Sequence, residues 1–337
     1  MIVIDGSAGE GGGQILRNAL ALSLITGQPF RMENVRGRRK RPGLMRQHIT
    51  AVEAACEIGG ASCEGLQVGA SVLTFRPGKV IPGSYHFAIG TAGSTGLVLQ
   101  ALLAPLMLAD APSRIVLEGG THNMQAPAFE FLARAYLPLV NRMGPRVEAR
   151  LIRHGFYPRG GGRIEVDVEP ARLQPLDCME RGATVGVRAC AVVAGLSEEI
   201  ARRELTTARK LLDWPGDVFV AHQLPEELGP GNVLMLEARF EHVTEIVTGF
   251  GKLGVSSELL ARKAARRMAG YLGTSAFAGP FLADQLVTLF MLAGAGRFTT
   301  VSPSEHTRSA MHIGGLFLDR HCRIDPEPDG RHVVSVT

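Results

Sequence analysis

The sequence has few cysteines, and none of them lies in a C-x-x-C pair. Five cysteines are scattered along 337 residues: Cys56, Cys63, Cys178, Cys190 and Cys322. This spacing argues against a disulfide framework and against a cysteine-based zinc site. It favours reduced thiols, and we therefore expect a cytoplasmic protein.

Long hydrophobic runs are also missing. The most apolar stretch, residues 97–109, is too short to span a bilayer and contains Gln100. The N-terminal MIVIDG is typical of a strand and lacks the basic segment and cleavage site of a secretory signal. We expect a soluble chain with no membrane partner. Its net charge of +4 permits an anionic partner without requiring one.

Glycine, by contrast, is abundant: 41 residues, clustered at 9–13, 59–60, 119–120, 160–162 and 314–315. Such clusters mark tight turns or places where the backbone approaches a ligand closely.

The hydrophobic pattern predicts one order of elements twice. The first copy has strands at 2–5, 29–36, 62–68 and 71–76 and helices at 13–26 and 42–60. The second has strands at 84–90, 113–120, 146–155 and 162–170 and helices at 92–109 and 127–144. Each copy is therefore a βαβαββ unit.

A third copy is expected in residues 274–337, with helices at 282–296 and 308–319, strands at 297–302, 322–327 and 331–337, and no evident opening strand. The segment before it is expected to form an inserted α/β domain, with strands at 183–194, 217–223, 233–240 and 244–250 and helices at 197–212 and 256–272. We predict an α/β (α+β) fold with a large domain of three repeats (residues 1–180 and 273–337) and a small inserted domain (181–272).

The loop DGSAGEGGGQILRNAL (5–20) runs into the first helix but matches neither common nucleotide motif. Gly12 and Gly13 replace the lysine and hydroxyl of a P-loop, and Gln14 replaces the third glycine of a Rossmann fingerprint. The helix N-terminus still favours anions. Glu10 either caps the helix dipole or holds a divalent ion against a phosphate.

The basic run VRGRRKRPGLMRQH (35–48) is a solvated loop, a nuclear-import patch, or a site for polyphosphate or an RNA backbone. It contains no interleaved aromatic residues, so base stacking is not implied.

Two further stretches have open roles. In RHGFYPRGGG (153–162), His154 and Arg159 contact a ligand, or His154 is a strand-end residue with a local hydrogen bond. His306 is expected in a short link between a strand and a helix, where a histidine is either incidental or a nucleophile or acid–base group.

Six stretches together resemble the RNA 3'-terminal phosphate cyclase family: GEGGGQILR (9–17), RPGLMRQH (41–48), TAGSTGLVLQ (91–100), RHGFYPRGGG (153–162), GPGN (229–232) and FLADQL (281–286). The resemblance covers nearly the whole chain. It implies a large domain of three βαβαββ units, like those in the C-terminal domain of translation initiation factor three, with a small inserted α/β domain.

The resemblance also implies a reaction. ATP would convert an RNA 3'-terminal phosphate to a 2',3'-cyclic phosphate, through a covalent histidine–AMP and then an RNA-pp-A intermediate. His306 would be the nucleophile, and Glu10 would hold a divalent metal, Mg²⁺ or Mn²⁺. The implied ATP-binding residues are Arg17, Arg36, Arg39, Gln47, Gln100 and Gln285, with Pro127, Phe131 and Phe281 around adenine.

One position departs from the family pattern and one keeps two roles. The family often has tyrosine where this chain has Phe281, so a hydroxyl contact is lost. Asp284 would contact the nucleotide or orient His306.

Three alternatives differ in function. A non-catalytic relative that acts in ribosomal RNA maturation shares the fold but lacks the histidine nucleophile. A plain RNA-binding protein would use the basic run, and an enolpyruvyl transferase has similar repeats but does not suit His306 or the triple glycine. Exposed sheet edges are compatible with a homodimer.

Overall fold

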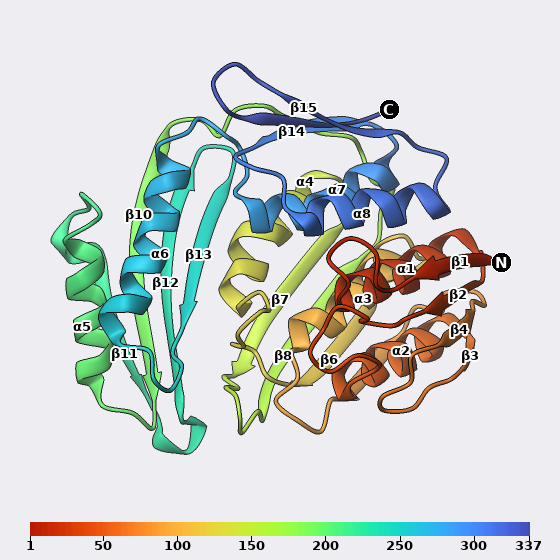
Figure 1. Cartoon of the computed structure of the whole chain (residues 1–337), viewed down its shortest axis with the longest axis horizontal. Helices are drawn as coiled ribbons and strands as arrows, with labels where there is room; N and C mark the ends of the chain where they lie inside the picture. Colours follow the sequence, from red (N-terminus) through yellow and green to blue (C-terminus); the bar gives the residue numbers. More distant parts are fainter.

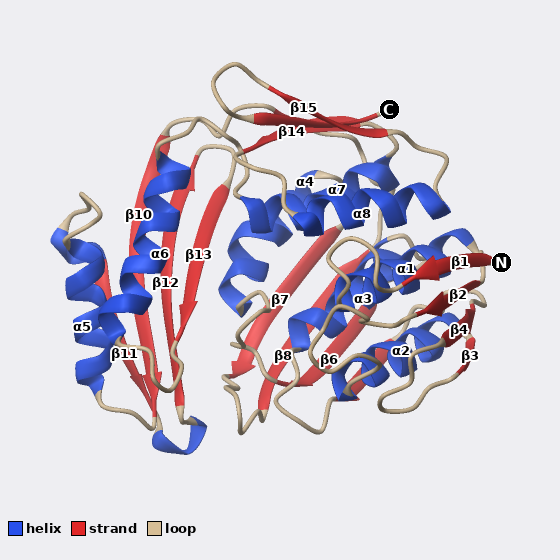
Figure 2. Cartoon of the chain, viewed as in Figure 1, coloured by secondary structure: helices blue, strands red, loops and turns tan.

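The computed structural model describes residues 1–337 as a mixed α/β protein, which confirms the predicted fold class (Figures 1 and 2). Its sixteen strands form four four-stranded sheets, and eight α-helices, α1 to α8, accompany them. None of these helices combines the length and the hydropathy needed to cross a bilayer. All five cysteines are free thiols.

The first sheet comes from the N-terminal segment. Its strands are β1 (Ile2–Asp5), β2 (Phe30–Glu33), β3 (Ser62–Glu64) and β4 (Leu73–Arg76), in the order β1-β2-β4-β3. The β1–β2 pair is parallel, and the other pairs are antiparallel. Helices α1 (Gly13–Thr26) and α2 (Arg46–Gly59) each end at a left-handed glycine.

The second sheet has the same order and strand directions. It contains β5 (Ser84–Ala88), β6 (Ser113–Gly119), β7 (Arg146–Arg153) and β8 (Gly162–Glu169), arranged β5-β6-β8-β7. Helix α3 spans Thr95–Met107. The helix predicted over 127–144 is a π-helical segment, η1 (Phe131–Tyr136), that continues into α4 (Leu137–Arg142).

The third sheet repeats this order with β9 (Asp177–Cys178), β14 (Gly296–Thr300), β15 (Cys322–Pro326) and β16 (His332–Val336), arranged β15-β16-β14-β9. Helices α7 (Pro280–Ala293) and α8 (Glu305–Phe317) complete it. The opening strand that the sequence pattern did not reveal is β9. It has only two residues, and it precedes the segment 181–272.

The fourth sheet is built from that segment. Its strands are β10 (Thr184–Ala194), β11 (Phe219–Leu224), β12 (Gly231–Phe240) and β13 (Thr244–Phe250), in the order β11-β10-β12-β13. Helices α5 (Glu198–Arg209) and α6 (Ser257–Leu272) pack together on it, and short 3₁₀ turns, η2 (Gly216–Val218) and η3 (Glu226–Leu228), flank β11. In Figure 1 this unit lies at the left, beside the other three sheets.

Two predictions of local structure were wrong. The helix expected from residue 42 begins at Arg46, because Met45 is in an extended conformation and forms the N-cap. His306 does not lie in a link. It is the second residue of α8, because Ser304 caps that helix and its hydroxyl accepts hydrogen bonds from the backbone N–H groups of His306 and Thr307.

The helices meet in the interior. Helix α1 packs against α2, α3 and α8, and α7 packs against α8 (Figure 1). Ten of the thirteen residues of α3 are buried, as expected for a helix that is apolar on nearly every side. One hydrophobic cluster of 79 buried residues extends through all four units. This packing brings the N-terminal ends of several helices together.

Candidate active site

The starts of α1, α7 and α8 and one face of α3 border a single cavity of about 510 Å³. Helix N-termini carry partial positive charge and free N–H groups, so this arrangement suits an anionic ligand. Every residue that the family resemblance proposed lines this cavity: Glu10, Arg17, Arg36, Arg39, Gln47, Gln100, Pro127, Phe131, Phe281, Asp284, Gln285 and His306. The segment 181–272 also contributes, through β13 and Arg267 of α6.

Glu10 is held on the cavity wall with one carboxylate oxygen free. Its side chain is only 3% exposed, and Oε2 forms an ion pair with Nη2 of Arg39. Its backbone N–H donates to the Ser309 hydroxyl at 3.0 Å. The other oxygen, Oε1, is buried without a hydrogen-bond partner. A buried carboxylate oxygen with no partner is costly unless another group satisfies it, and a cation suits it.

The imidazole of His306 has a defined orientation. Its Nδ1 lies 2.7 Å from Oε1 of Gln14 and 3.8 Å from Oε2 of Glu10. Because an amide oxygen only accepts hydrogen bonds, this contact favours the tautomer with the proton on Nδ1 and a lone pair on Nε2. The side chain is 43% exposed, so Nε2 is accessible from the cavity.

Asp284 fixes the helix turn that carries His306. Its Oδ1 accepts hydrogen bonds from the hydroxyls of Ser304, at 2.5 Å, and Thr307, at 2.6 Å. Burial raises the pKa of this carboxyl above its usual value, although both hydroxyls oppose the shift. Of the two roles left open for Asp284, these contacts match orientation of His306.

A hydrogen-bonded chain crosses the cavity wall from α1 to α7. Arg17 donates through Nε to Oε1 of Gln100 at 2.8 Å, and Nε2 of Gln100 donates to Gln285. Arg17 is only 8% exposed. Burial lowers its pKa to about 10, so the guanidinium is still charged near neutral pH. Little water surrounds the buried guanidinium to offset its charge, so an anion in the cavity would be attracted to it strongly.

The basic run shapes the cavity through its backbone contacts. Arg36 donates from Nη1 to the carbonyls of Arg41 and Gly43, and Arg38 donates to the carbonyl of Gly9 at 2.8 Å. Gln47 accepts from the backbone N–H of Ser94, the N-cap of α3, at 3.2 Å. These bonds tie residues 34–47 to the glycine loop and to α3.

One side of the cavity is apolar. Phe131 of η1 is buried and lies close to Pro127 in the chain, whereas Phe281 at the start of α7 is 47% exposed. The Arg267 guanidinium lies 5.9 Å from the centroid of the Phe281 ring. This wall can accept a flat ring, with a cation close to one side of it.

Comparison with known proteins identifies the family. The family model for RNA 3'-terminal phosphate cyclase matches residues 8–324. The chain belongs to this family. A protein of Koribacter versatilis (strain Ellin345) named RNA 3'-terminal phosphate cyclase is 49% identical, over all of this chain and 95% of that protein. A Pseudomonas fluorescens protein of the same name is 47% identical, over all of this chain and 97% of its own length.

Among solved structures, the enolpyruvyl transferase NikO from Streptomyces tendae is similar to this cyclase-family chain at 14% identity and a TM-score of 0.37. The match covers 99% of the chain and 48% of NikO. Similarity at this level supports no conclusion about fold or function.

The stretch RHGFYPRGGG of this cyclase-family chain lies outside the cavity. Phe156 is buried in a small cluster with Cys190, Val192, Ala194, Val233 and Met235, on the sheet of residues 184–250. Arg159 donates to the carbonyl of Glu227. The motif therefore joins the second sheet to the fourth, and His154 points to a separate group of side chains.

The lining residues that sequence reasoning missed include Gln14, His48 and Arg267. Gln14 lies within the quoted stretch GEGGGQILR, but it was noted there only as the residue that replaces the third glycine of a Rossmann fingerprint. His48 also lies in a quoted motif. Burial lowers its pKa to about 3, so it is neutral there. Arg267 sits in a helix with several arginines and carries no signal in the sequence.

Proposed function

We propose that this chain uses ATP to convert an RNA 3'-terminal phosphate into a 2',3'-cyclic phosphate, with His306 as the nucleophile. The observation that carries the proposal is the position of His306 at a cavity lined by the buried Arg17 and the more exposed Arg36 and Arg39. The names of the 47–49% identical relatives describe the same activity.

In the first step, Nε2 of His306 attacks the α-phosphorus of ATP. An N–P bond forms, the bond to the bridging oxygen breaks, and pyrophosphate leaves with that electron pair. The proton on Nδ1 remains hydrogen-bonded to Gln14, and the positive charge that develops on the ring lies 3.8 Å from the Glu10 carboxylate. Glu10 thus stabilises the charged intermediate.

Arg17, Arg36 and Arg39 would bind the triphosphate and neutralise the leaving pyrophosphate. Glu10 also fits a divalent ion, because its unpartnered Oε1 can serve as one ligand while phosphate oxygens and water supply the others. Such an ion, Mg²⁺ or Mn²⁺, would stabilise negative charge on the phosphates. Adenine would lie between Phe281 on one side and Pro127 with Phe131 on the other.

The later steps use the same histidine as a leaving group. An oxygen of the RNA 3'-phosphate attacks the AMP phosphorus, the N–P bond breaks, and its electron pair returns to Nε2. The vicinal 2'-hydroxyl then attacks the 3'-phosphorus, expels AMP and releases its proton to solvent. This ring closure needs little assistance, because the nucleophile is already adjacent to an activated phosphorus.

The first test is transfer of label from α-labelled ATP to the protein. Wild type should retain acid-labile, base-stable label in the presence of Mg²⁺ or Mn²⁺, and His306→Ala should retain none. His312→Ala is the matched control, because it removes an exposed histidine from the same helix. Equal labelling of wild type and His306→Ala would overturn the mechanism.

A second test concerns the cation. Glu10→Gln keeps the size of the side chain and removes its charge, so the metal concentration that gives half-maximal adenylylation should rise about tenfold, the equivalent of about 1.4 kcal/mol. An unchanged metal dependence would contradict the metal-binding role of Glu10 and favour the alternative, in which Glu10 caps the helix dipole.

Three properties of the whole molecule belong to the same proposal. We propose that residues 181–272 are a domain inserted into a large domain of residues 1–180 and 273–337, since β9 and α7 bracket that segment. Limited proteolysis should cut first near these two boundaries.

We also propose a cytoplasmic location, in which the free thiols stay reduced. We further propose a homodimer through exposed sheet edges, which light scattering would detect as twice the mass of one chain.

A further inference from the structure

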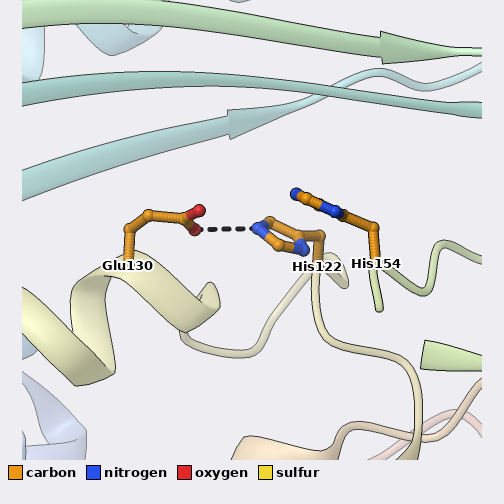
Figure 3. A group of neighbouring side chains, drawn as sticks. All are labelled: His122, Glu130 and His154. Atoms are coloured by element: carbon orange, nitrogen blue, oxygen red, sulfur yellow. Dashed lines mark hydrogen bonds and ion pairs between the residues drawn. The ribbon is translucent and has the colours of Figure 1, made fainter. Parts of the chain in front are cut away.

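A second group of ionisable side chains lies behind the nucleotide cavity. His122 follows β6, Glu130 immediately precedes η1, and His154 follows β7 (Figure 3). Nε2 of His122 lies 2.8 Å from Oε2 of Glu130, and the two imidazole rings are stacked with centroids 5.1 Å apart. One nitrogen or oxygen atom of each residue lies within 4.8 Å of the other two.

His122 and Glu130 are largely shielded from water, and the cluster adjoins a cavity. The His122 side chain is fully buried, and that of Glu130 is 14% exposed. His154 and Glu130 line a cavity of about 270 Å³ that His222 also borders. The His122–Glu130 contact holds one proton between the two residues, and a cation bound to all three residues would replace that proton.

We propose that His122, Glu130 and His154 bind one divalent transition-metal ion, with Zn²⁺ as the best match. Two imidazoles and one carboxylate form a common open zinc site, in which water takes the fourth position. With bonds of about 2.0–2.2 Å, ligand atoms in such a site lie about 3.4 Å apart. The His122–Glu130 pair opens slightly to admit the ion, and the His154 ring turns toward it.

The outer contacts of His122 permit this arrangement. Its Nδ1 lies 2.8 Å from the hydroxyl oxygen of Thr121, which also accepts from the backbone N–H of Gly155 at 2.9 Å. In the metal-bound form, Nδ1–H would donate to Thr121 and Nε2 would present its lone pair to the ion. Metal-bound histidines are usually oriented by such a partner on the other nitrogen.

The ion would connect two parts of the molecule. His122 and Glu130 stand at the two ends of residues 123–129, and Gln125, Ala126 and Pro127 of this loop line the nucleotide cavity. His154 belongs to RHGFYPRGGG, which holds the fourth sheet. The ion would therefore fix the loop behind the nucleotide cavity to the junction between the second and fourth sheets.

The test is direct metal binding by the full chain, without ATP. Chain freed of metal by a chelator is titrated with Zn²⁺ in a calorimeter and, in parallel, with Co²⁺ while the visible absorption is recorded. Wild type should bind one equivalent and give the intense absorption of four-coordinate cobalt. Loss of a residue that orients a metal ligand costs about 10–100-fold in affinity, so loss of a ligand in His154→Ala or Glu130→Gln should cost about 100-fold or more.

Two controls separate this site from other ligands. His222→Ala removes a histidine of the same cavity outside the cluster, and Glu10→Gln alters the cation site of the proposed function; each should change the affinity by less than about twofold. His154 is partly exposed, so its variant should fold, and circular dichroism verifies this. Absence of saturable binding, or equal binding by wild type and His154→Ala, would overturn the proposal and leave a hydrogen-bonded His–Glu pair.

Discussion

The two glycine-rich loops, residues 9–13 and 155–162, look alike in the sequence but need glycine for different reasons. In the first loop, a Cβ on Gly12 would overlap the side-chain ends of Arg39 and Glu10, and a Cβ on Gly13 would lie 2.6 Å from Nε2 of His48. These glycines leave room that polar side chains occupy at the cavity wall.

In the second loop the obstacle is backbone. A Cβ on Gly155 would overlap the carbonyl oxygen of Gly119 and the nitrogen of Gly162, and one on Gly162 would lie 2.6 Å from the nitrogen of Gly155. Side-chain ends can move aside, but paired backbone cannot. A methyl group on Gly12 or Gly13 should therefore affect the chemistry more than the folding, and one on Gly155 or Gly162 should affect the folding more than the chemistry.

The largest effect is expected for Gly155→Ala. Overpacking against fixed backbone should lower the free energy of unfolding by about 3 kcal/mol or more, as measured by urea denaturation. Gly161→Ala is the matched control in the same loop. Its Cβ meets nothing within 4 Å, so only its φ of +71° matters, at a cost of about 1 kcal/mol. Equal losses in the two variants would show that the backbone contact is not the reason.

A third kind of glycine makes room for a buried carboxylate. The contribution of this carboxylate to stability depends on pH. A Cβ on Gly279 would lie 2.5 Å from Oε1 of Glu245, whose pKa is raised by burial to about 7. The folded state therefore favours the protonated acid. Stability is greatest below the unfolded pKa of 4.5 and is lost as the pH rises toward the folded pKa.

Substitution of Glu245 by glutamine should remove this dependence. Between about pH 5 and about pH 8, the free energy of unfolding of wild type should fall by about 2 kcal/mol because of Glu245, and Glu245→Gln should not show this fall. Denaturation curves across this range provide the measurement. Burial also raises the pKa of Glu204 to about 7. The variant should therefore still show the part of the pH dependence of the free energy of unfolding that Glu204 causes. Parallel pH profiles for wild type and variant would contradict the buried ionisation.

An intermediate effect, on chemistry alone, is expected for Gly12→Ala. The added methyl group should displace the Arg39–Glu10 ion pair and slow adenylylation of His306 about tenfold, which corresponds to about 1.4 kcal/mol. The free energy of unfolding should change by less than about 1 kcal/mol, because both side-chain ends can move. A stability loss as large as that of Gly155→Ala would erase the distinction between the loops.

The smallest effect is expected within the pair at 314–315 in α8. A Cβ on Gly315 meets nothing within 4 Å, so Gly315→Ala should stabilise the protein by about 0.5–1 kcal/mol through helix propensity. A Cβ on Gly314 would overlap the sulfur of Met291, so Gly314→Ala should destabilise it. Thermal melting of both variants should show shifts of opposite sign.

Periodicity predicted most of the elements, because alternation and helical spacing are local properties. It failed where the decisive contact is distant in the chain. Strand β9 has two residues and exists only through its pairing with β14. The Ser304 hydroxyl that caps α8 is itself held by Asp284, twenty residues earlier.

The residues around the cavity could be proposed from a family pattern but not from spacing. The ion pair of Glu10 with Arg39 and the contact of Gln14 with His306 join segments separated by long stretches of chain. No local rule brings them together. For the triple glycine at 160–162 the sequence left a tight turn and a close approach open, and in the structure Gly160 and Gly162 lie against other backbone segments.

The position of β9 has a consequence for the order in which the molecule assembles. The first and second sheets use contiguous stretches, residues 2–76 and 84–169. The third must wait, because Asp177 and Cys178 pair with Arg297 and Phe298 across the whole inserted segment, and closing so long a loop is slow. During synthesis, the glycine loop and the basic run are complete long before α8 leaves the ribosome. A chain that stops early therefore has most of its arginines in place but lacks the histidine that would react.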